Sequence, residues 1–143
     1  MQFHSITGQK DTKEQLVQMI QHNRLSHALL FLGKEGGGAL QLAQAFAQYI
    51  VCEKVNGKQT KVVAEPSLFG DPEPPTTNDK PQTFNDSCGE CAACKKATAL
   101  IHPDIHFSYP VITKKPGEKP ISADFIKEWR EFIVQNPYGN VYD

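Results

Sequence analysis

Residues 33–40 read Gly33-Lys34-Glu35-Gly36-Gly37-Gly38-Ala39-Leu40. Gly33 and Gly38 have the spacing of the two glycines in the phosphate-binding loop G-x-x-x-x-G-K-[ST]. Ala39 and Leu40 stand where that motif has its lysine and its hydroxyl, which contact the phosphates and bind magnesium. Losing both contacts, at about 1.5 to 3 kcal/mol each, weakens triphosphate binding by ~10²- to 10⁴-fold. The sequence therefore predicts a loop shaped for phosphate that does not hydrolyse nucleotide.

The residues on either side of this loop predict a buried strand followed by a helix. Residues 28–32 form a continuous apolar run, which suits a strand covered on both faces of a parallel sheet. From Ala39 to Ile50 apolar residues recur at the spacing of one helical face. Such a turn binds anions through backbone N–H groups, although a plain tight turn needing positive φ is the alternative. The candidate loop residues are Gly33, Lys34, Gly36, Gly37, Gly38 and Ala39.

The four cysteines of the chain predict a metal site. Cys88, Cys91 and Cys94 have C-x2-C-x2-C spacing, and Cys52 follows the helix expected after the glycine loop. Together they match the ligand set of a tetrahedral structural zinc. Closing the long loop between Cys52 and Cys88 costs about 3 kcal/mol of chain entropy, whereas binding of a structural zinc contributes ~10 to 16 kcal/mol to folding. There are two alternatives. Two disulfides are disfavoured because no secretory signal precedes the cysteines. A redox C-x-x-C pair is disfavoured because it leaves one cysteine of the run unexplained.

The remaining segments are ordinary but can be placed. Residues 53–87 are rich in proline and polar residues and predict a flexible excursion. A first helix is expected to begin near Asp11 or Thr12, with one of them as its N-cap. Residues 105–110 predict a second strand. A last helix, capped by Ser122 and ending before Pro137, carries aromatic residues on one face, which we expect to be core.

Length and charge set outer limits. The chain has 143 residues and a net charge of −1. It therefore has no overall positive charge that would attract it to nucleic acid. No apolar stretch approaches membrane-spanning length, and no internal repeat is visible.

Several motifs, taken in order, resemble one family. They are residues 3–9 (FHSITGQ), residues 25–33 (LSHALLFLG), the glycine loop, the four cysteines and residues 102–104 (HPD). This order is similar to that at the N-terminus of the AAA+ subunits of the bacterial DNA polymerase III clamp loader. Within that family the resemblance is to the delta-prime type, because the tau/gamma type keeps the lysine and hydroxyl that Ala39 and Leu40 replace.

The resemblance implies an α/β fold: an AAA+ domain with parallel strands, incomplete at its C-terminus, with an inserted zinc module. Residues 1–51 would hold the strand, glycine turn and helix of the AAA+ domain. Residues 52–101 would form the zinc module, with 53–87 flexible. Residues 102–143 would add a second strand and helix, truncated before Walker B. We expect this fragment to self-associate through unpaired strand edges.

The resemblance also implies a function. The chain would be a cytoplasmic, stator-like subunit that helps load the sliding clamp on primed DNA during replication. Its partners would be the tau/gamma and delta subunits and, through the complex, primed DNA and the clamp; no membrane is expected. Zinc would be structural and ATP would not be hydrolysed. No catalytic activity of its own is expected, although the whole complex is a nucleotidyltransferase.

Two other functions stay open from the residues. An active P-loop ATPase of the tau/gamma type would use Lys34 in place of the missing lysine, although Glu35 puts a negative charge beside the phosphate position. A zinc-ribbon DNA-binding module would bind through Lys95 and Lys96, with strong salt dependence.

Overall fold

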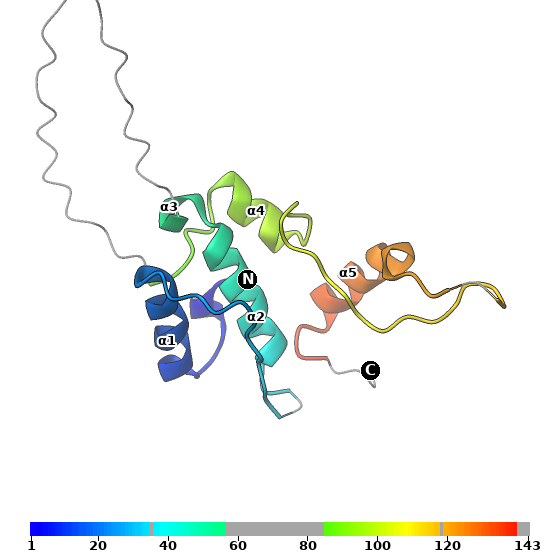
Figure 1. Ribbon diagram of the computed structural model, residues 1–143, viewed down its shortest axis with the longest axis horizontal. Coiled ribbons are helices and arrows are strands. Elements are labelled where there is room, and N and C mark those ends of the chain that lie inside the picture. The colour runs from blue at the N-terminus through cyan, green and yellow to red at the C-terminus, as the bar shows by residue number, and fades with distance from the viewer. Residues whose placement is uncertain (35, 57–84, 118, 140–143) are drawn as a thin grey trace, which may run out of the picture.

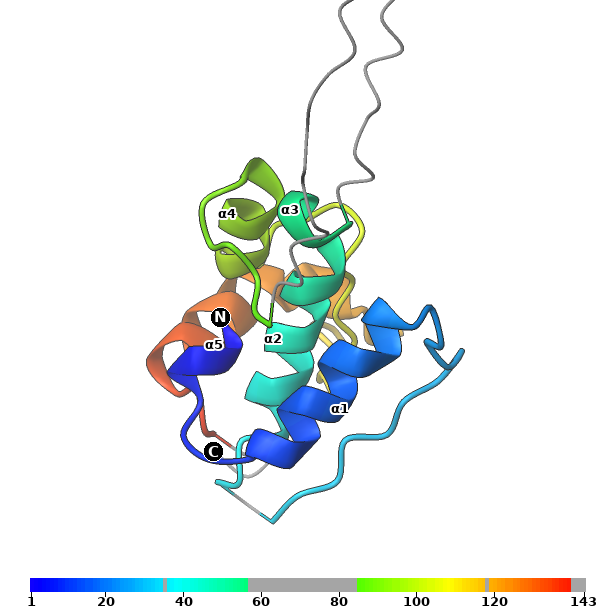
Figure 2. The ribbon, with the colours of Figure 1, turned by 90° about the vertical axis from the view of Figure 1, so that its left-hand side faces the viewer.

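The computed structural model describes residues 1–34, 36–56, 85–117 and 119–139. In chain order they form η1 (Phe3–Ser5), α1 (Lys10–Gln21), α2 (Ala39–Val51), α3 (Glu53–Asn56), α4 (Ala92–Thr98), η2 (Ser122–Phe125) and α5 (Ile126–Gln135). Helix α2 is central: α1 and α5 lie on opposite sides of it, and α3 and α4 gather at its C-terminal end (Figure 1). In the view turned by 90°, α1 lies alongside α2 (Figure 2).

The core forms around α2 because its apolar residues follow the period of a helix. Leu42, Phe46 and Tyr49 are almost fully buried along it. The rest of the core comes from η1, the turn after it, α1 and a second row on α2: Phe3, Ile6, Leu16, Val17 and Ala45. The ring of Phe3 lies 5.7 Å from that of Tyr49, which ties η1 to the last turn of α2. The helix predicted after the glycine loop is therefore confirmed.

The expected parallel sheet was wrong, because none of the described residues forms a strand. Residues 28–32 instead form an irregular segment that crosses α1 and α2. Leu29 and Phe31 pack on the core, whereas Leu30 and Leu32 are 82% and 84% exposed. A strand exists through ladder hydrogen bonds to a neighbour. Within the described part of the chain, no backbone hydrogen bond joins residues 28–32 to another segment.

The second expected strand is wrong for the same reason. Half-buried side chains alternate with exposed ones along residues 105–112, as they would in a strand with one covered face. Phe107 and Tyr109 pack on Trp129 of α5, at ring distances of 4.6 and 4.8 Å. The hydroxyl of Tyr109 donates to the carbonyl oxygen of Ser122 at 2.6 Å. Side-chain packing on a helix, not a ladder, positions this segment.

The helix ends differ from the sequence-based expectations. Helix α1 begins at Lys10, and its N-cap is Gln9 at φ 53°, with no side-chain cap from Asp11 or Thr12. Ser122 starts the short η2 instead of capping α5, which begins at Ile126 and ends before Pro137 as predicted. In α5 only Ile133 is fully buried, so the aromatic face is half-buried packing.

Most of the predicted flexible excursion, residues 57–84, lies outside the described residues. Its two described ends are the helical turn α3 and residues 85–87. No described helix is both long and apolar enough to cross a membrane.

Candidate metal centre and glycine turn

The structure brings the four cysteines together. Cys52 is the C-cap of α2, Cys91 is the N-cap of α4, and Cys94 lies in the first turn of α4, while Cys88 lies in the loop before it. Their four Sγ atoms all lie within 4.8 Å of one another. The packing of α4 on the end of α2 therefore supplies a complete set of thiol ligands.

The spacing of the sulfur atoms fits a tetrahedral metal. A zinc bound at about 2.3 Å by four thiolates places the sulfurs about 3.8 Å apart. Cys88 Sγ and Cys94 Sγ are 3.9 Å apart. All four cysteines are free thiols, so the residues present fit a structural metal ion.

Backbone N–H groups already point at three of the sulfurs. The amide of Cys88 donates to Cys52 Sγ, that of Cys91 to Cys88 Sγ and that of Cys94 to Cys91 Sγ, each at 3.4 Å. Such bonds favour the thiolate, which is the form that binds a metal. The loop conformation thus prepares the sulfurs for a cation.

The thiols differ in their protonation. At Cys88, desolvation acts to raise the pKa, but hydrogen bonds from the backbone of Cys91 and Glu90 outweigh it and lower the pKa to about 6. At Cys94, burial in the interior raises the pKa well above its usual range. Cys52 and Cys94 are fully buried, whereas Cys88 and Cys91 are half-buried. In a metal-free site, Cys88 therefore forms the thiolate at a lower pH than Cys94 does.

Polar contacts join α3 to the cysteine loop, residues 85–91, and to the first turn of α4. Lys54 Nζ lies 3.2 Å from Glu90 Oε2, and the hydrogen bond to Glu90 is the main reason that the pKa of Lys54 is raised. Glu53 Oε1 accepts a hydrogen bond from the backbone N–H of Ala93 at 3.2 Å. Both pairs are exposed, so they fix geometry more than they add stability.

Sequence reasoning missed the residues that support the cysteine loop from below. Ser87, next to Cys88, is 3% exposed, and its hydroxyl accepts a hydrogen bond from Gln48 Nε2 at 3.1 Å. Gln48 is 1% exposed, and its Oε1 accepts one from Thr98 Oγ1 at 3.0 Å. The residue pattern held no signal for Gln48, because it lies on the side of the helix opposite the apolar stripe of Ala39, Leu42, Phe46 and Ile50.

The glycine turn lies at the other end of α2. Gly36 and Gly38 have positive φ, at 70° and 77°, and Gly38 is the N-cap of α2. The backbone N–H of Gly37 donates to Lys34 O at 2.8 Å, which closes the turn. At about 1.5 Å rise per residue, the 13 residues of α2 separate this turn from the cysteines by about 20 Å. The two candidate sites therefore lie at opposite ends of α2.

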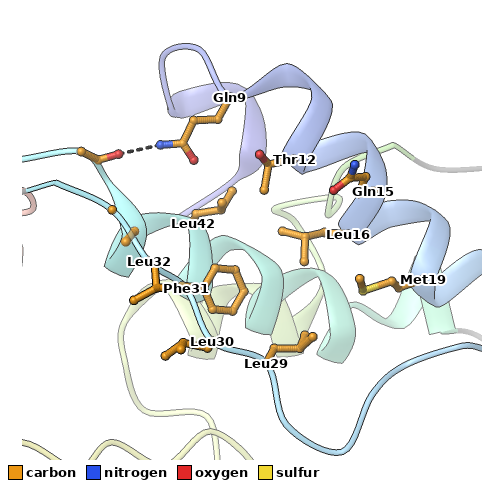
Figure 3. Close-up of a pocket in the computed structure, with 13 residues that line it drawn as sticks. Gln9, Thr12, Gln15, Leu16, Met19, Leu29, Leu30, Phe31, Leu32 and Leu42 are labelled. Atoms are coloured by element: carbon orange, nitrogen blue, oxygen red, sulfur yellow. Dashed lines mark hydrogen bonds between the residues drawn. The ribbon is translucent and has the colours of Figure 1, made fainter.

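Side chains of the protein itself occupy the mouth of the turn. Gln9 Nε2 donates to the carbonyl oxygen of Gly37 at 2.5 Å (Figure 3). A Cβ built on Gly38 would lie 3.4 Å from the ring of Tyr138 and 3.6 Å from Oε1 of Gln41. Lys34 is exposed, Ala39 is half-buried and Leu40 is 39% exposed. Apart from Lys34, none of these residues carries a charge.

A cavity of about 320 Å³ opens beside the turn. One wall comes from Gln9 and α1, with Thr12, Gln15, Leu16 and Met19, and the other from residues 29–33 (Figure 3). Its polar groups are neutral amides and a hydroxyl, so it carries no charge matched to a phosphate.

Comparison with known proteins gives consistent matches. Residues 8–65 match the family described as DNA polymerase III, delta subunit. The chain is 30% identical over 110 residues to the DNA polymerase III subunit delta' of Pseudomonas aeruginosa, covering 77% of this chain and 24% of that protein. It is 30% identical over 114 residues to the subunit delta' of Bacillus subtilis, covering 78% of this chain and 26% of that protein. The chain thus spans about a quarter of the length of these relatives. No solved structure matches it.

Proposed function

We propose, from the premise that this chain belongs to the family of DNA polymerase III delta-prime subunits, that it acts as a non-hydrolysing, stator-like part of a clamp loader. In that role it helps to load the sliding clamp on primed DNA during replication. Its partners are the tau/gamma and delta subunits, and it meets primed DNA and the clamp within the complex. It works in the cytoplasm.

The observation that carries the non-hydrolysing role is the chemistry at the N-terminus of α2. Ala39 and Leu40 provide neither the ammonium nor the hydroxyl that phosphate and magnesium require. Gln9 already bonds the carbonyl of Gly37, and Tyr138 lies against Gly38. The turn Gly33, Lys34, Gly36, Gly37, Gly38 and Ala39 is therefore a degenerate phosphate loop that connects elements of a rigid body.

The proposed cofactor is zinc, held by Cys52, Cys88, Cys91 and Cys94 in a structural role. Four thiolates close the coordination shell, which leaves no open position for a substrate or water. The ion would join the C-terminal end of α2 to α4 and add to the stability of the fold.

Calorimetry with magnesium-ATP tests the non-hydrolysing role. We expect no saturable heat at millimolar ATP for the unmodified chain. A double variant, Ala39→Lys with Leu40→Thr, restores both missing groups and should gain binding if the loop frame is intact. Saturable binding by the unmodified chain, with phosphate release over time, would overturn the proposal in favour of an active ATPase.

A pull-down with purified tau/gamma and delta subunits tests the clamp-loader role. We expect the chain to be retained with them, and to be retained equally after Lys95→Ala with Lys96→Ala. Gel shifts test the alternative DNA-binding role: salt-sensitive DNA binding that those two substitutions abolish, without retention by the subunits, would favour it. The expected self-association through unpaired strand edges loses its basis, because none of the described residues forms a strand.

A further inference from the structure

Asp86 links the cysteine loop to the N-terminal segment of the chain. Its Oδ1 accepts a hydrogen bond from the backbone N–H of Phe3, and its Oδ2 accepts one from the backbone N–H of His4, both at 3.0 Å. The imidazole Nδ1 of His4 lies 3.0 Å from Oδ2 as well. Asp86 also accepts, through Oδ1, from the backbone N–H of Ser87 at 2.7 Å. One carboxylate therefore holds the start of η1 and its own loop together.

A second set of contacts joins the same two segments. Gln2 Nε2 donates to the carbonyl oxygen of Ser87 at 2.6 Å. Gly89 is so close to Gln2 that a Cβ there would lie 2.9 Å from its Oε1. These contacts lie directly beside Cys88, so a shift of the cysteine loop would break them together.

The N-terminal segment in turn carries part of the core. Phe3 is 3% exposed and Ile6 is 3% exposed, and both belong to the cluster with α1 and α2. Among the described residues, the backbone of η1 makes only local turn bonds besides those to Asp86, such as Ile6 N to Phe3 O at 3.2 Å. The position of Phe3 thus depends on the loop that Asp86 belongs to as well as on its packing against Tyr49.

We propose that metal binding at the four cysteines is coupled, through Asp86, to the docking of residues 2–6 on the α1–α2 core. The inference rests on the proposed metal site. A bound ion fixes Cys88, and with it the position of Asp86 two residues earlier. Without the ion, the loop carrying Asp86 keeps its hydrogen bond to Gln48 but loses the tie through the metal. The two hydrogen bonds that the Asp86 carboxylate accepts from η1 then break more often. Asp86 is a positioning residue: it touches no metal but transmits the state of the site.

Coupling is reciprocal, so it can be measured from both ends. The first measurement is amide hydrogen exchange, followed by nuclear magnetic resonance on the zinc-loaded chain and after chelation. We expect chelation to speed exchange at Phe3 and His4 by at least about tenfold, while the amide of Phe46 in the middle of α2 stays protected. Unchanged exchange at Phe3 and His4 in a chain that has lost its metal would overturn the coupling. Equal loss of protection at Phe46 would also overturn it, because the ion would then hold the whole fold.

The second measurement is zinc affinity, determined by competition with a chromogenic chelator. Asp86→Ala should weaken zinc binding by about tenfold, whereas Asp104→Ala, at an exposed turn, should leave it unchanged. In zinc-loaded Asp86→Asn, the single remaining oxygen can still serve Phe3 and Ser87, so only the His4 amide should lose protection. Wild-type affinity in Asp86→Ala would overturn the proposal.

Metal analysis separates this inference from the proposal on which it rests. Zinc near one per chain with no response at Phe3 and His4 removes only the coupling. A chain that binds no zinc removes the structural metal site, and the coupling with it.

Discussion

The backbone N–H of Cys88 donates to Sγ of Cys52 across 3.4 Å, although the two residues lie 36 positions apart in the chain. Cys52 ends α2 and Cys88 begins the loop that leads into α4. The contact closes the cysteine site before any ion is considered, and it joins the helix that carries the core to the segment that carries three of the four thiols. An ion bound by the cysteines would therefore contact both α2 and the loop before α4.

Cys52→Ser tests this junction. Serine keeps the size of the side chain but removes a thiolate ligand, so zinc affinity should fall by more than the 10- to 100-fold typical of losing an outer partner. Chelator competition gives the affinity, and metal analysis gives the stoichiometry. Lys54→Ala, which removes only the exposed pair with Glu90, is the control and should stay within about threefold of the unmodified chain. Equal affinities for Cys52→Ser and the unmodified chain would remove Cys52 from the ligand set.

In the metal-free chain, Cys88 should be alkylated faster than Cys94. Its pKa of about 6 makes it mostly thiolate at neutral pH, whereas Cys94, whose pKa is raised by burial, stays protonated. Because the pKa of Cys88 is lowered, its reactivity should fall as the pH drops through about 6. Mass spectrometry after brief iodoacetamide treatment at several pH values measures the order. Faster labelling of Cys94 than of Cys88 would contradict the assignment, and added zinc should protect both.

Gly37→Ala should destabilise the fold by about 1 to 3 kcal/mol, because the new Cβ would lie 2.7 Å from the carbonyl oxygen of Lys34. That oxygen accepts the hydrogen bond that closes the turn, so it cannot move away without breaking the bond. Gly33→Ala is the matched control: its Cβ would meet only the Cβ of Ala39 at 3.3 Å, and it should cost less than about 1 kcal/mol. Denaturant unfolding compares the two free energies. Equal values would show that the turn is not held by the Lys34 carbonyl.

Phe46→Ala should lower the free energy of unfolding by about 3 to 5 kcal/mol, since its ring is 3% exposed and lies in the centre of the core. Leu40→Ala, on the same helix but 39% exposed, should cost less than about 1 kcal/mol. Thermal and denaturant unfolding give both values. A similar loss for the two variants would mean that α2 does not bury the face assigned to it.

Residue spacing alone identified the features that depend on local chemistry. The helix at residues 39–51 could be predicted because its apolar period and the glycines before it belong to one short segment. The gathering of the four cysteines could be predicted because four thiols at that spacing have few other uses. The failed N-cap of α1 shows the limit of such signals: Gln9 in the left-handed region starts the helix, and neither Asp11 nor Thr12 is needed.

The tertiary structure decided the features that depend on a neighbour. An apolar run such as residues 28–32 is compatible with a strand, but a strand requires a second backbone beside it, and the described residues provide helices there instead. The role of Asp86 was equally invisible, because an aspartate in a polar loop acquires its function only from the two amides that folding brings to it across 83 and 82 positions. The sequence by itself determines local structure such as helices and turns. Pairings between distant segments are decided by the tertiary structure, because they depend on which surfaces fold close enough to bury each other.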